Sequence, residues 1–331
     1  MSNQKLTMTA SLMLKAAKKR GIECEILDED TIKMTRGNKW WYTRGSKSSF
    51  QSSVGDSIAL RKDLSKIVFN HFHIPTARHI VIKNKSDVFL LRKLIFPLVM
   101  KPFNGSEGAG VIIGIKNLDQ AKNCLSKIQI DSSNYVLFEE TLIGNEYRIL
   151  CIDHKFVAAN HRKAAHVTGN GEKTIKELII EKNLHPWRGE KQTKPLSKIL
   201  IDELVIDYLK EQNLTINSIP KKNQEVSLRK TANISTGGES WNVTDQACKE
   251  NIELFEKISS ICDLDTVGID VMCNSLEIPI AQQKSGGIIE VNAAPYLRMH
   301  HYPLKGKPID TASIILDMIE IKYEVANYRR Q

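Results

Sequence analysis

The sequence lacks any uninterrupted apolar run of about 18 residues, the length that a helix needs to cross a bilayer. Residues 1–5 have no apolar core followed by a small-residue cleavage site, so we expect no secretory signal. We therefore expect a cytoplasmic protein with no membrane partner.

Paired cysteines are also missing. The six cysteines contain no C-x-x-C motif and have no histidine cluster around them, which argues against zinc and against disulfides. We expect reduced thiols that pack as small hydrophobic residues. None has the local signature of a nucleophile, and no Ser/His or Cys/His arrangement is evident, so covalent catalysis is not indicated.

The chain has an excess of positive charge but no tract of five or more like charges. Its formal net charge is +9, from 47 Lys and Arg against 38 Asp and Glu. Residues 155–198 concentrate this excess, with ten basic and four acidic side chains. A nucleic acid, a polyanionic nucleotide or an acidic peptide would each suit such a segment. Because aromatic and basic residues do not interleave, we disfavour nucleic acid.

The composition, 41% hydrophobic and 26% charged, is that of an ordinary globular protein, and 331 residues suggest about two domains or one large α/β (α+β) unit with subdivisions. Short alternating or β-branched runs predict many strands, with amphipathic helices between them. Among the helices we expect one over residues 57–72 and a long one near residues 197–213. No internal repeat or low-complexity linker divides the chain.

Two late apolar runs carry oxygen-bearing side chains. Residues 268–272 include Asp270, and residues 287–295 include Glu290 and Asn292. Because side chains two apart on a strand share a face, Glu290 and Asn292 should point the same way. Carboxylate and amide oxygens suit Mg²⁺, which also keeps waters and substrate phosphates as ligands. The alternative is an edge strand with solvated acids.

A glycine-rich loop over residues 103–110 follows the strand that ends near Lys101. It matches neither G-x-x-x-x-G-K-[ST] nor G-x-G-x-x-G, and a strand rather than a helix follows it, which argues against a P-loop or a dinucleotide fold. Such a loop between antiparallel strands can fold over phosphates, its amides donating hydrogen bonds while Lys101 adds a positive charge. The alternative is a plain hairpin turn.

Several motifs in the same order resemble the ATP-grasp ligase family. The resemblance is to the ATP-grasp module of cyanophycin synthetase and the glutathione synthetase module of the fused bacterial glutathione enzyme. The segments that carry the first likeness are residues 169–175, 186–189, 228–238, 243–245, 289–295 and 298–300, and those that carry the second are residues 9–75 and 302–306.

The resemblance implies an ATP-grasp fold of three subdomains, residues 1–75, 76–142 and 143–331, with ATP between two antiparallel sheets. It implies ATP and two Mg²⁺ ions as cofactors, with Mn²⁺ as a substitute for Mg²⁺. The residues implied to hold ATP are Lys62, Lys101, Gly105, Ser106, Gly108, Gly110, Glu139, Leu142 and Glu146. Lys62 and Lys101 would hold the phosphates, Glu139 and the backbone through Leu142 would read adenine, and Glu146 would bind the ribose.

The remaining family roles concern the metal and the substrates. Asp270, Glu290 and Asn292 would hold the Mg²⁺ ions. Arg229, Asn233 and Arg298 are the implied catalytic residues. The implied substrate-binding residues are Arg148, Arg162, Ser235, Thr236, Gly237 and His300.

The resemblance implies ATP-dependent ligation of a carboxylate and an amine through an acyl phosphate, on amino-acid or small peptide substrates. Cyanophycin synthetase also has a Mur-ligase-like module, for which 331 residues leave no room, so we expect no cyanophycin synthesis by this chain unaided. The alternatives are a glutathione synthetase-like ligase joining γ-glutamylcysteine and glycine, a nucleotide-binding module without catalysis, and a nucleic-acid binder. A homo-oligomer is compatible with each.

Overall fold

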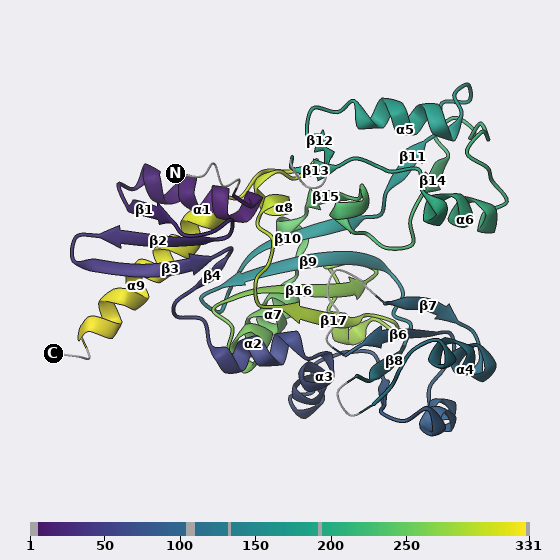
Figure 1. Cartoon of the computed structure of the whole chain (residues 1–331), viewed down its shortest axis with the longest axis horizontal. Coiled ribbons are helices and arrows are strands. Elements are labelled where there is room, and N and C mark those ends of the chain that lie inside the picture. The colour runs from purple at the N-terminus through teal and green to yellow at the C-terminus, as the bar shows by residue number, and fades with distance from the viewer. Residues whose placement is uncertain (1–5, 104–109, 132–133, 191–193, 329–331) are drawn as a thin grey trace. The chain divides into compact units, whose positions relative to one another are not determined.

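The computed structural model describes residues 6–103, 110–131, 134–190 and 194–328, although the side chains of residues 325–328 are not described. The chain divides into two compact units (Figure 1). Unit 1 comprises Met1–Ser49, Ala158–Thr244 and Tyr296–Gln331, and unit 2 comprises Phe50–Val157 and Asp245–Pro295.

Unit 1 contains a four-stranded antiparallel sheet in the order β1-β2-β3-β4. Its strands are β1 (Glu23–Ile26), β2 (Thr31–Arg36), β3 (Lys39–Arg44) and β4 (Lys47–Ser48). The helices α1 (Met8–Lys19) and α9 (Thr311–Tyr328) pack against each other, and α1 packs on β1 and β2. Alternation buries Ile32, Met34 and Trp41 on the helix-facing side.

A second part of unit 1 is built around its own apolar core. It contains β11 (His166–Thr168) paired with β14 (Glu225–Ser227), and the helices α5 (Ile175–Asn183) and α6 (Glu203–Glu211). Short strands β12 (Arg188–Gly189) and β13 (Leu196–Ser197) pair in parallel. The core residues are Ala165, Val167, Ile175, Leu178, Ile179, Ile199, Val205, Leu209, Val226 and Leu228.

The rest of unit 1 joins β10 (Lys155–Lys163), whose residues from Ala158 onward belong to this unit, to β15 (Glu239–Asn242) in antiparallel register. The 3-10 turns η3 (Ile234–Thr236) and η4 (Thr244–Gln246) flank β15. The short helix α8 (Arg298–His301) packs on β15.

Unit 2 contains a four-stranded antiparallel sheet in the order β5-β8-β6-β7. Its strands are β5 (His79–Ile82), β6 (Leu98–Pro102), β7 (Ile112–Ile115) and β8 (Val136–Glu140). One face packs with the 3-10 helix η1 (Lys85–Lys93) and with α4 (Leu118–Ser126) around Leu98, Met100 and Phe138. The other face is therefore the one on which Lys101 and Glu139 lie.

A second set of antiparallel strands in unit 2 has β16 (Thr266–Cys273) between β9 (Asn145–Ile152) and β17 (Gly287–Asn292). Helix α7 (Lys249–Ile261) packs on β9 and β16. The 3-10 turn η5 (Ile280–Gln282) precedes β17, and α2 (Ser53–Leu60) and α3 (Lys62–His71) pack on β17.

Two predicted helices differ from the structure. The helix predicted over residues 57–72 is two helices, α2 and α3, because Arg61 is extended (φ −98°, ψ 102°) and interrupts the hydrogen-bond ladder. The helix predicted near residues 197–213 starts only at Glu203, where Asp202 caps it by accepting from the Val205 amide. Residues 196–197 belong to β13 instead. All six cysteines are free thiols, as predicted.

Candidate functional site

Lys101 and Glu139 project from neighbouring strands of unit 2 on the face away from the apolar core. Val99 pairs with Glu139 and Lys101 pairs with Leu137, so both charged residues follow the same alternation. Lys101 Nζ lies 2.6 Å from Glu139 Oε2. The predicted phosphate lysine is therefore held by a carboxylate of the adjacent strand.

A second lysine, Lys66 of α3, reaches the same carboxylate. Its Nζ lies 3.1 Å from Glu139 Oε1 and 3.4 Å from the carbonyl oxygen of Ile288, and it also bonds Thr76 Oγ1. The Thr76 hydroxyl donates to Ile288 O at 2.8 Å. Lys66 thus joins the four-stranded sheet to the first residues of β17.

The three charges shift one another's pKa values. Burial opposes ionisation of Glu139, but the positive charges of Lys66 and Lys101 outweigh it and lower the pKa of this carboxyl to about 2. Burial lowers the pKa of Lys66 despite Glu139. For Lys101, burial is outweighed by Glu139, with Glu290 and Asp270 contributing, and its pKa is raised. Lys101 therefore stays positively charged and lies within the field of the predicted metal ligands.

The three predicted metal ligands lie on one face of β16 and β17. Asp270 is opposite Glu290, and Gly268 is opposite Asn292, so Glu290 and Asn292 share a face, as their two-residue spacing predicted. Asn292 Nδ2 lies 3.4 Å from Asp270 Oδ2. Lys62 Nζ lies 3.6 Å from Glu290 Oε2. Although β17 is the edge strand of its sheet, Glu290 is only partly exposed and lies beside a lysine, and Asp270 on β16 is buried.

Asp270 is already engaged by Arg148, the residue opposite it on β9. Arg148 Nη2 donates to Asp270 Oδ2 at 2.9 Å and its Nε donates to Oδ1, a buried bidentate pair. The structure thus places Arg148, predicted to bind substrate, on a predicted metal ligand. Among the described residues, no group of three or more His, Cys, Asp and Glu forms a metal site by itself.

The predicted adenine and ribose residues lie at the start of β9 and before it. Glu146 is two residues from Arg148 on the same face of β9, opposite Met272. Leu142 lies in the connection from β8 to β9, with its side chain beside Gly287. Glu139, predicted at the adenine hinge, has its carboxylate between two lysines. Its role toward adenine stays a prediction.

The glycine-rich loop spans the hairpin between β6 and β7, but Gly105, Ser106 and Gly108 lie outside the described residues. Its ends are fixed. Phe103 donates its amide to Tyr135 O and accepts from the amide of Lys62, and its ring stacks on Tyr135. Gly110 has φ 72° and a Cβ there would lie 2.8 Å from Pro102 Cγ, which explains a glycine at this end of the loop.

Unit 1 holds the predicted substrate turn, Ser235, Thr236 and Gly237. Gly237 closes the turn with φ 96°. The buried Arg188 supports it, donating from Nη1 to Gly237 O at 3.0 Å and from Nη2 to Glu239 Oε1 at 3.1 Å. The buried pair of Arg188 and Glu239 therefore holds this turn in position.

Glu239 is the centre of this support. Lys182 Nζ lies 2.7 Å from its Oε1 and His166 Nε2 lies 3.8 Å from its Oε2. Burial opposes ionisation, but the lysine and arginine outweigh it and lower the pKa of Glu239. Burial lowers the pKa of His166, with Lys182 acting in the same direction.

The predicted catalytic residues Arg229 and Asn233 lie in the segment that leads into the Ser235–Gly237 turn. Arg229 is buried and its Nη2 bonds Asp202, the residue that caps α6. The Asn233 carbonyl accepts from the amides of Thr236 and Gly238. Both residues have structural bonds in the described protein, and their catalytic roles stay predictions.

Arg162 lies on β10, and Arg298 and His300 lie on α8, in unit 1. Arg162 of β10 is opposite Ser240 of β15. Asn160, two residues earlier on the same face of β10, donates from Nδ2 to Met299 O at 3.1 Å in α8. The backbone of α8 thus lies against β10, and Arg298 and His300 are buried, while the roles of these three residues toward substrate stay predictions.

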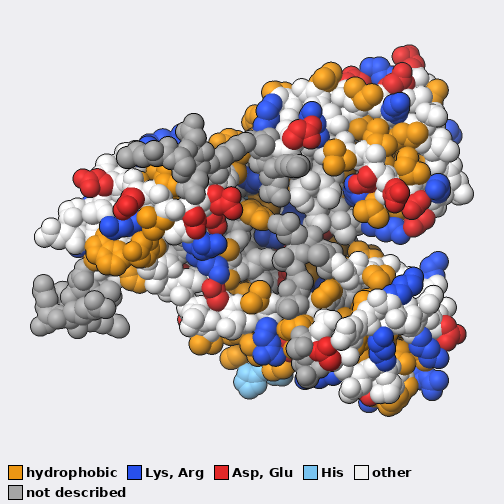
Figure 2. All heavy atoms as spheres, viewed as in Figure 1, with side chains coloured by type: hydrophobic (Ala, Val, Ile, Leu, Met, Phe, Trp, Pro, Cys, Tyr) orange, Lys and Arg blue, Asp and Glu red, His pale blue; other side chains and the backbone are white. Residues whose placement is uncertain are grey.

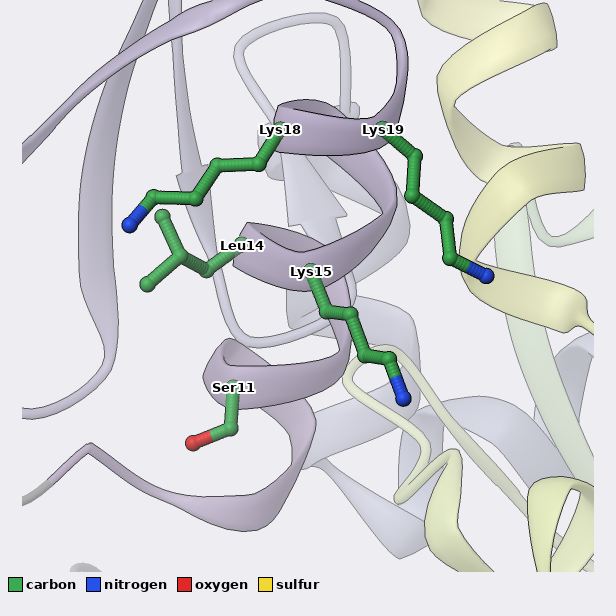
Figure 3. Close-up of a pocket in the computed structure, with 5 residues that line it drawn as sticks. All are labelled: Ser11, Leu14, Lys15, Lys18 and Lys19. Carbon is green, nitrogen blue, oxygen red and sulfur yellow. The ribbon is translucent and has the colours of Figure 1, made fainter.

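A hollow of about 520 Å³ on α1 has a different character. Ser11, Leu14, Lys15, Lys18 and Lys19 line it, none of which was predicted as a site residue. In Figure 3 the lysine side chains spread apart along the helix instead of converging. This hollow carries no candidate site.

Two buried groups escaped sequence reasoning, Lys66 with Thr76 and Glu239 with its cations. Lys66 follows Lys62 by four residues, one helical turn, which was the available signal. Nothing local indicated that Glu139, 73 positions later in the chain, would bury it. Glu239 directly follows the Gly237–Gly238 turn, and its sequence neighbours gave no indication of Lys182 or Arg188.

Unit 2 has Lys101 on one antiparallel sheet, Lys62 and Lys66 on α3, and Asp270, Glu290 and Asn292 on the other set of antiparallel strands, which is the arrangement of an ATP-grasp ligase. Residues 60–173 match the RimK-like ATP-grasp domain. The chain belongs to the ATP-grasp ligase family, whose members are ATP-dependent ligases, and the predicted α+β fold is confirmed. No helix within the described residues is long and apolar enough to span a membrane.

Particular relatives are cyanophycin synthetases and bifunctional glutathione proteins. The chain is 33% identical over 310 residues to the cyanophycin synthetase of Trichormus variabilis, covering 93% of this chain and 34% of that protein. It is 33% identical over 324 residues to the bifunctional glutathione biosynthesis protein GshAB of Clostridium perfringens, covering 95% of this chain and 41% of that protein. The chain thus spans well under half the length of these relatives.

Solved structures agree. The bifunctional glutathione synthetase from Pasteurella multocida matches with a TM-score of 0.73 and 29% identity, over 96% of this chain and 44% of that one. D-alanine–D-alanine ligase from Bacillus anthracis matches with a TM-score of 0.51 and 16% identity, over 85% of this chain and 72% of that one, which supports the fold alone.

Proposed function

We propose that this chain is an ATP-dependent carboxylate–amine ligase that joins amino-acid or small peptide substrates through an acyl phosphate and releases ADP and phosphate. The observation that carries this proposal is the array of Lys101 and Glu139 on one sheet of unit 2, with Lys66 of α3 beside Glu139, together with Asp270, Glu290 and Asn292 on the other sheet. Cations for phosphates and oxygens for a metal thus lie in one unit.

Lys101 and Lys62 are the residues we assign to the ATP phosphates. Each lies beside a carboxylate, Glu139 for Lys101 and Glu290 for Lys62, which positions the lysine side chain next to the acids of the site. Lys66 is completely buried, so we assign it to positioning Glu139 instead of to ATP. Glu139 in turn orients Lys101.

The reaction needs these groups because a carboxylate is a poor electrophile. Attack of the substrate carboxylate on the γ-phosphate of ATP forms a new P–O bond and releases ADP. The amine then attacks the acyl phosphate carbon, and phosphate leaves as the C–N bond forms. The protein positions the reactants and neutralises charge, so it needs no covalent nucleophile.

The oxygen donors on β16 and β17 fit Mg²⁺, but Asp270 differs from the other two because Arg148 already binds it. Glu290 and Asn292 share a face, and their oxygens are the hard donors that Mg²⁺ prefers. Asp270 has both carboxylate oxygens bonded to Arg148, so it joins the metal only by sharing an oxygen. When bound, the metal would neutralise the negative charge of the phosphates.

The residues that we assign to substrate binding, other than Arg148, lie in unit 1. Arg162 of β10 and Arg298 and His300 of α8 are the residues that we assign to a substrate carboxylate. Arg229, Asn233 and the Ser235–Gly237 turn are assigned to the acyl substrate, and Arg188 and Glu239 hold that turn in place. An acidic amino acid or peptide is the class that these side chains favour.

A glutathione synthetase-like activity is the second candidate. The match of 96% of this chain to the Pasteurella multocida bifunctional glutathione synthetase favours it. Only this activity would use γ-glutamylcysteine and glycine.

Phosphate release from ATP and Mg²⁺, measured across a panel of amino acids and dipeptides with mass spectrometry of each active mixture, tests the proposal. Release that requires both a carboxylate and an amine, with a condensed product, supports the ligase and identifies its substrates. Release confined to γ-glutamylcysteine with glycine supports the second candidate. ATP binding without release on any mixture would favour a nucleotide-binding module that has lost catalysis.

A further inference from the structure

Thr76, in the segment that connects α3 to β5, pairs with the start of β17, the strand of two predicted metal ligands. Thr76 and Ile288 form an isolated parallel bridge, and the Ile288 amide donates to Pro75 O at 2.8 Å. Because β17 is the edge strand of its sheet, residues 75–76 bond backbone groups that this edge would otherwise leave open. The segment that leads into the four-stranded sheet of unit 2 is therefore attached to β17.

The Thr76 hydroxyl uses both its donor and its acceptor capacity in this connection. It donates to Ile288 O at 2.8 Å and accepts from Lys66 Nζ. Lys66 Nζ in turn lies 3.1 Å from Glu139 Oε1 on β8. A chain of polar contacts therefore runs from the backbone of β17 through Thr76 and Lys66 to the carboxylate that holds Lys101.

Close packing at Gly287 leaves this junction little room to shift. A Cβ on Gly287 would lie 3.2 Å from Thr76 Cα and 3.3 Å from Leu142 Cδ1, closer than ordinary van der Waals contacts. The Ile143 amide donates to Ser285 O at 3.2 Å, just before β17. The segment predicted to read adenine therefore also meets the start of β17.

Helix α3 brings charged side chains to both sides of this junction. Lys62, one turn before Lys66, lies 3.6 Å from Glu290 Oε2. Burial lowers the pKa of Lys66, while Glu139 and Glu290 act in the opposite direction, so Lys66 lies within the field of both acids. Figure 2 shows apolar and charged side chains mixed on the surface where Figure 1 places α2 and α3, whereas Lys66 and Glu139 are buried. The contacts that join β17 to the four-stranded sheet therefore lie inside unit 2.

The residues assigned to ATP and to the metal lie on both sides of this junction. The phosphates are assigned to Lys62 and Lys101, and the metal to Glu290 and Asn292 on β17. Because a metal ion shared between protein oxygens and phosphates needs both at the right distance, a displacement of β17 by about 1 Å would weaken binding. The start of β17 is therefore a point at which one local contact can change the affinity for the metal and the nucleotide together.

We propose that Thr76 is a positioning residue that fixes β17 to the four-stranded sheet of unit 2 and thereby couples Mg²⁺ binding to ATP binding. Thr76 acts through Ile288 and Lys66, and this role requires no contact with either ligand. The inference rests on the proposed function, because it concerns the ATP and Mg²⁺ sites assigned there. Valine has the shape of threonine but can neither donate nor accept a hydrogen bond, whereas serine keeps the hydroxyl.

Calorimetric titration of the full chain with a non-hydrolysable ATP analogue, once with saturating Mg²⁺ and once with EDTA, tests this coupling. The ratio of the dissociation constant in EDTA to that in Mg²⁺ measures the coupling between the two ligands. Thr76→Val should lower this ratio about tenfold and change the constant in EDTA by less than about threefold. Thr76→Ser should keep the wild-type ratio, because its hydroxyl can make both hydrogen bonds.

Thr266→Val is the matched control. Thr266 is buried on β16, and its hydroxyl has no hydrogen bond within the part of the chain that the structure describes. The same substitution there should leave the ratio unchanged. Circular dichroism checks that each variant is folded, and Thr76→Ala, which also lacks the hydroxyl, takes the place of a Thr76→Val chain that does not fold.

A purely structural role of Thr76 would lower the free energy of unfolding without changing the ratio. An unchanged ratio in the folded Thr76 variant without a hydroxyl therefore overturns the inference and leaves the proposed function intact. A Thr76→Ser chain that loses the coupling as fully as Thr76→Val also overturns it, since the hydroxyl would then not be responsible. A wild-type chain that binds the analogue equally well with and without Mg²⁺ contradicts the metal site of the proposed function, and the inference fails with it.

Discussion

Lys66 Nζ lies 3.1 Å from Glu139 Oε1, and both side chains are almost completely removed from solvent. A buried lysine needs a carboxylate close by, because an isolated charge in an apolar interior is very costly. Here the pair also connects α3 to β8, and through Ile288 O to β17. The geometry of Lys101 thus depends on a residue that need not touch ATP.

Removing Lys66 should destabilise the protein. Lys66→Met leaves Glu139 buried with Lys101 as its remaining partner, and loss of one member of a buried pair costs about 3 kcal/mol. Urea unfolding measures the loss. Lys122→Met, at an exposed lysine that pairs with Asp119, is the matched control and should change stability by less than about 0.5 kcal/mol. Equal losses in the two variants would contradict this account.

Acid should abolish the contribution of Glu139. Its pKa of about 2 lies below the ordinary value of 4.5, so folding favours the charged form. The resulting stability is fully present above pH 4.5 and declines as the pH falls from there toward about 2. Glu139→Gln cannot titrate, so the difference in unfolding free energy between wild type and variant should shrink across this range. A difference independent of pH would refute the shift.

Loss of Glu290 should separate activity from folding. Glu290→Gln keeps the shape of the side chain but removes a negative oxygen donor, so Mg²⁺-dependent phosphate release should fall by at least about 100-fold. The unfolding midpoint should change little, because Glu290 is partly exposed. Glu277→Gln, at an exposed acid, is the control. Near-normal turnover in the Glu290 variant would remove this residue from the metal site.

A methyl group on Gly237 should distort the substrate turn. Gly237→Ala places a Cβ at φ 96° and 2.6 Å from Ile199 Cγ1, so strain and a steric clash add together. Gly21→Ala has a similar backbone penalty (φ 68°) but nothing within 4 Å, and serves as control. We expect the Gly237 variant to lose about 1–3 kcal/mol more than the control in urea unfolding. Equal losses of stability in the two variants would mean that the structure relaxes around the contact with Ile199 and that the contact adds no strain.

The faces of strand residues and the connections between neighbouring strands could be predicted from the sequence. The shared face of Glu290 and Asn292 followed from their spacing, and the register of β16 and β17 confirms it. The β6–β7 hairpin followed from apolar runs on either side of glycines. These features depend on residues close together in the sequence, where backbone geometry decides the outcome.

Contacts between residues far apart in the chain could not be predicted from the sequence. The bond between Arg148 and Asp270 joins positions 122 apart, and nothing near Arg148 distinguishes it from a surface arginine on a strand. The break at Arg61 was missed because the apolar spacing continues across it, and the bonds of the Arg61 side chain to Asp63 and to the distant Tyr135 have no signal in that spacing. The roles toward ATP, metal and substrate stay predictions.

The order of segments along the chain has a consequence for biosynthesis. Strand β9 ends at Ile152, and its partner β16 starts only at Thr266, after most of unit 1 has been made. At ribosomal rates of about 5–20 residues per second, β9 waits roughly 6–20 s for that partner. During this interval only the edge of β9 that faces β10 can pair, and its other edge lacks a neighbour, so newly made chains should be most vulnerable to aggregation and most dependent on chaperones before residue 295 emerges.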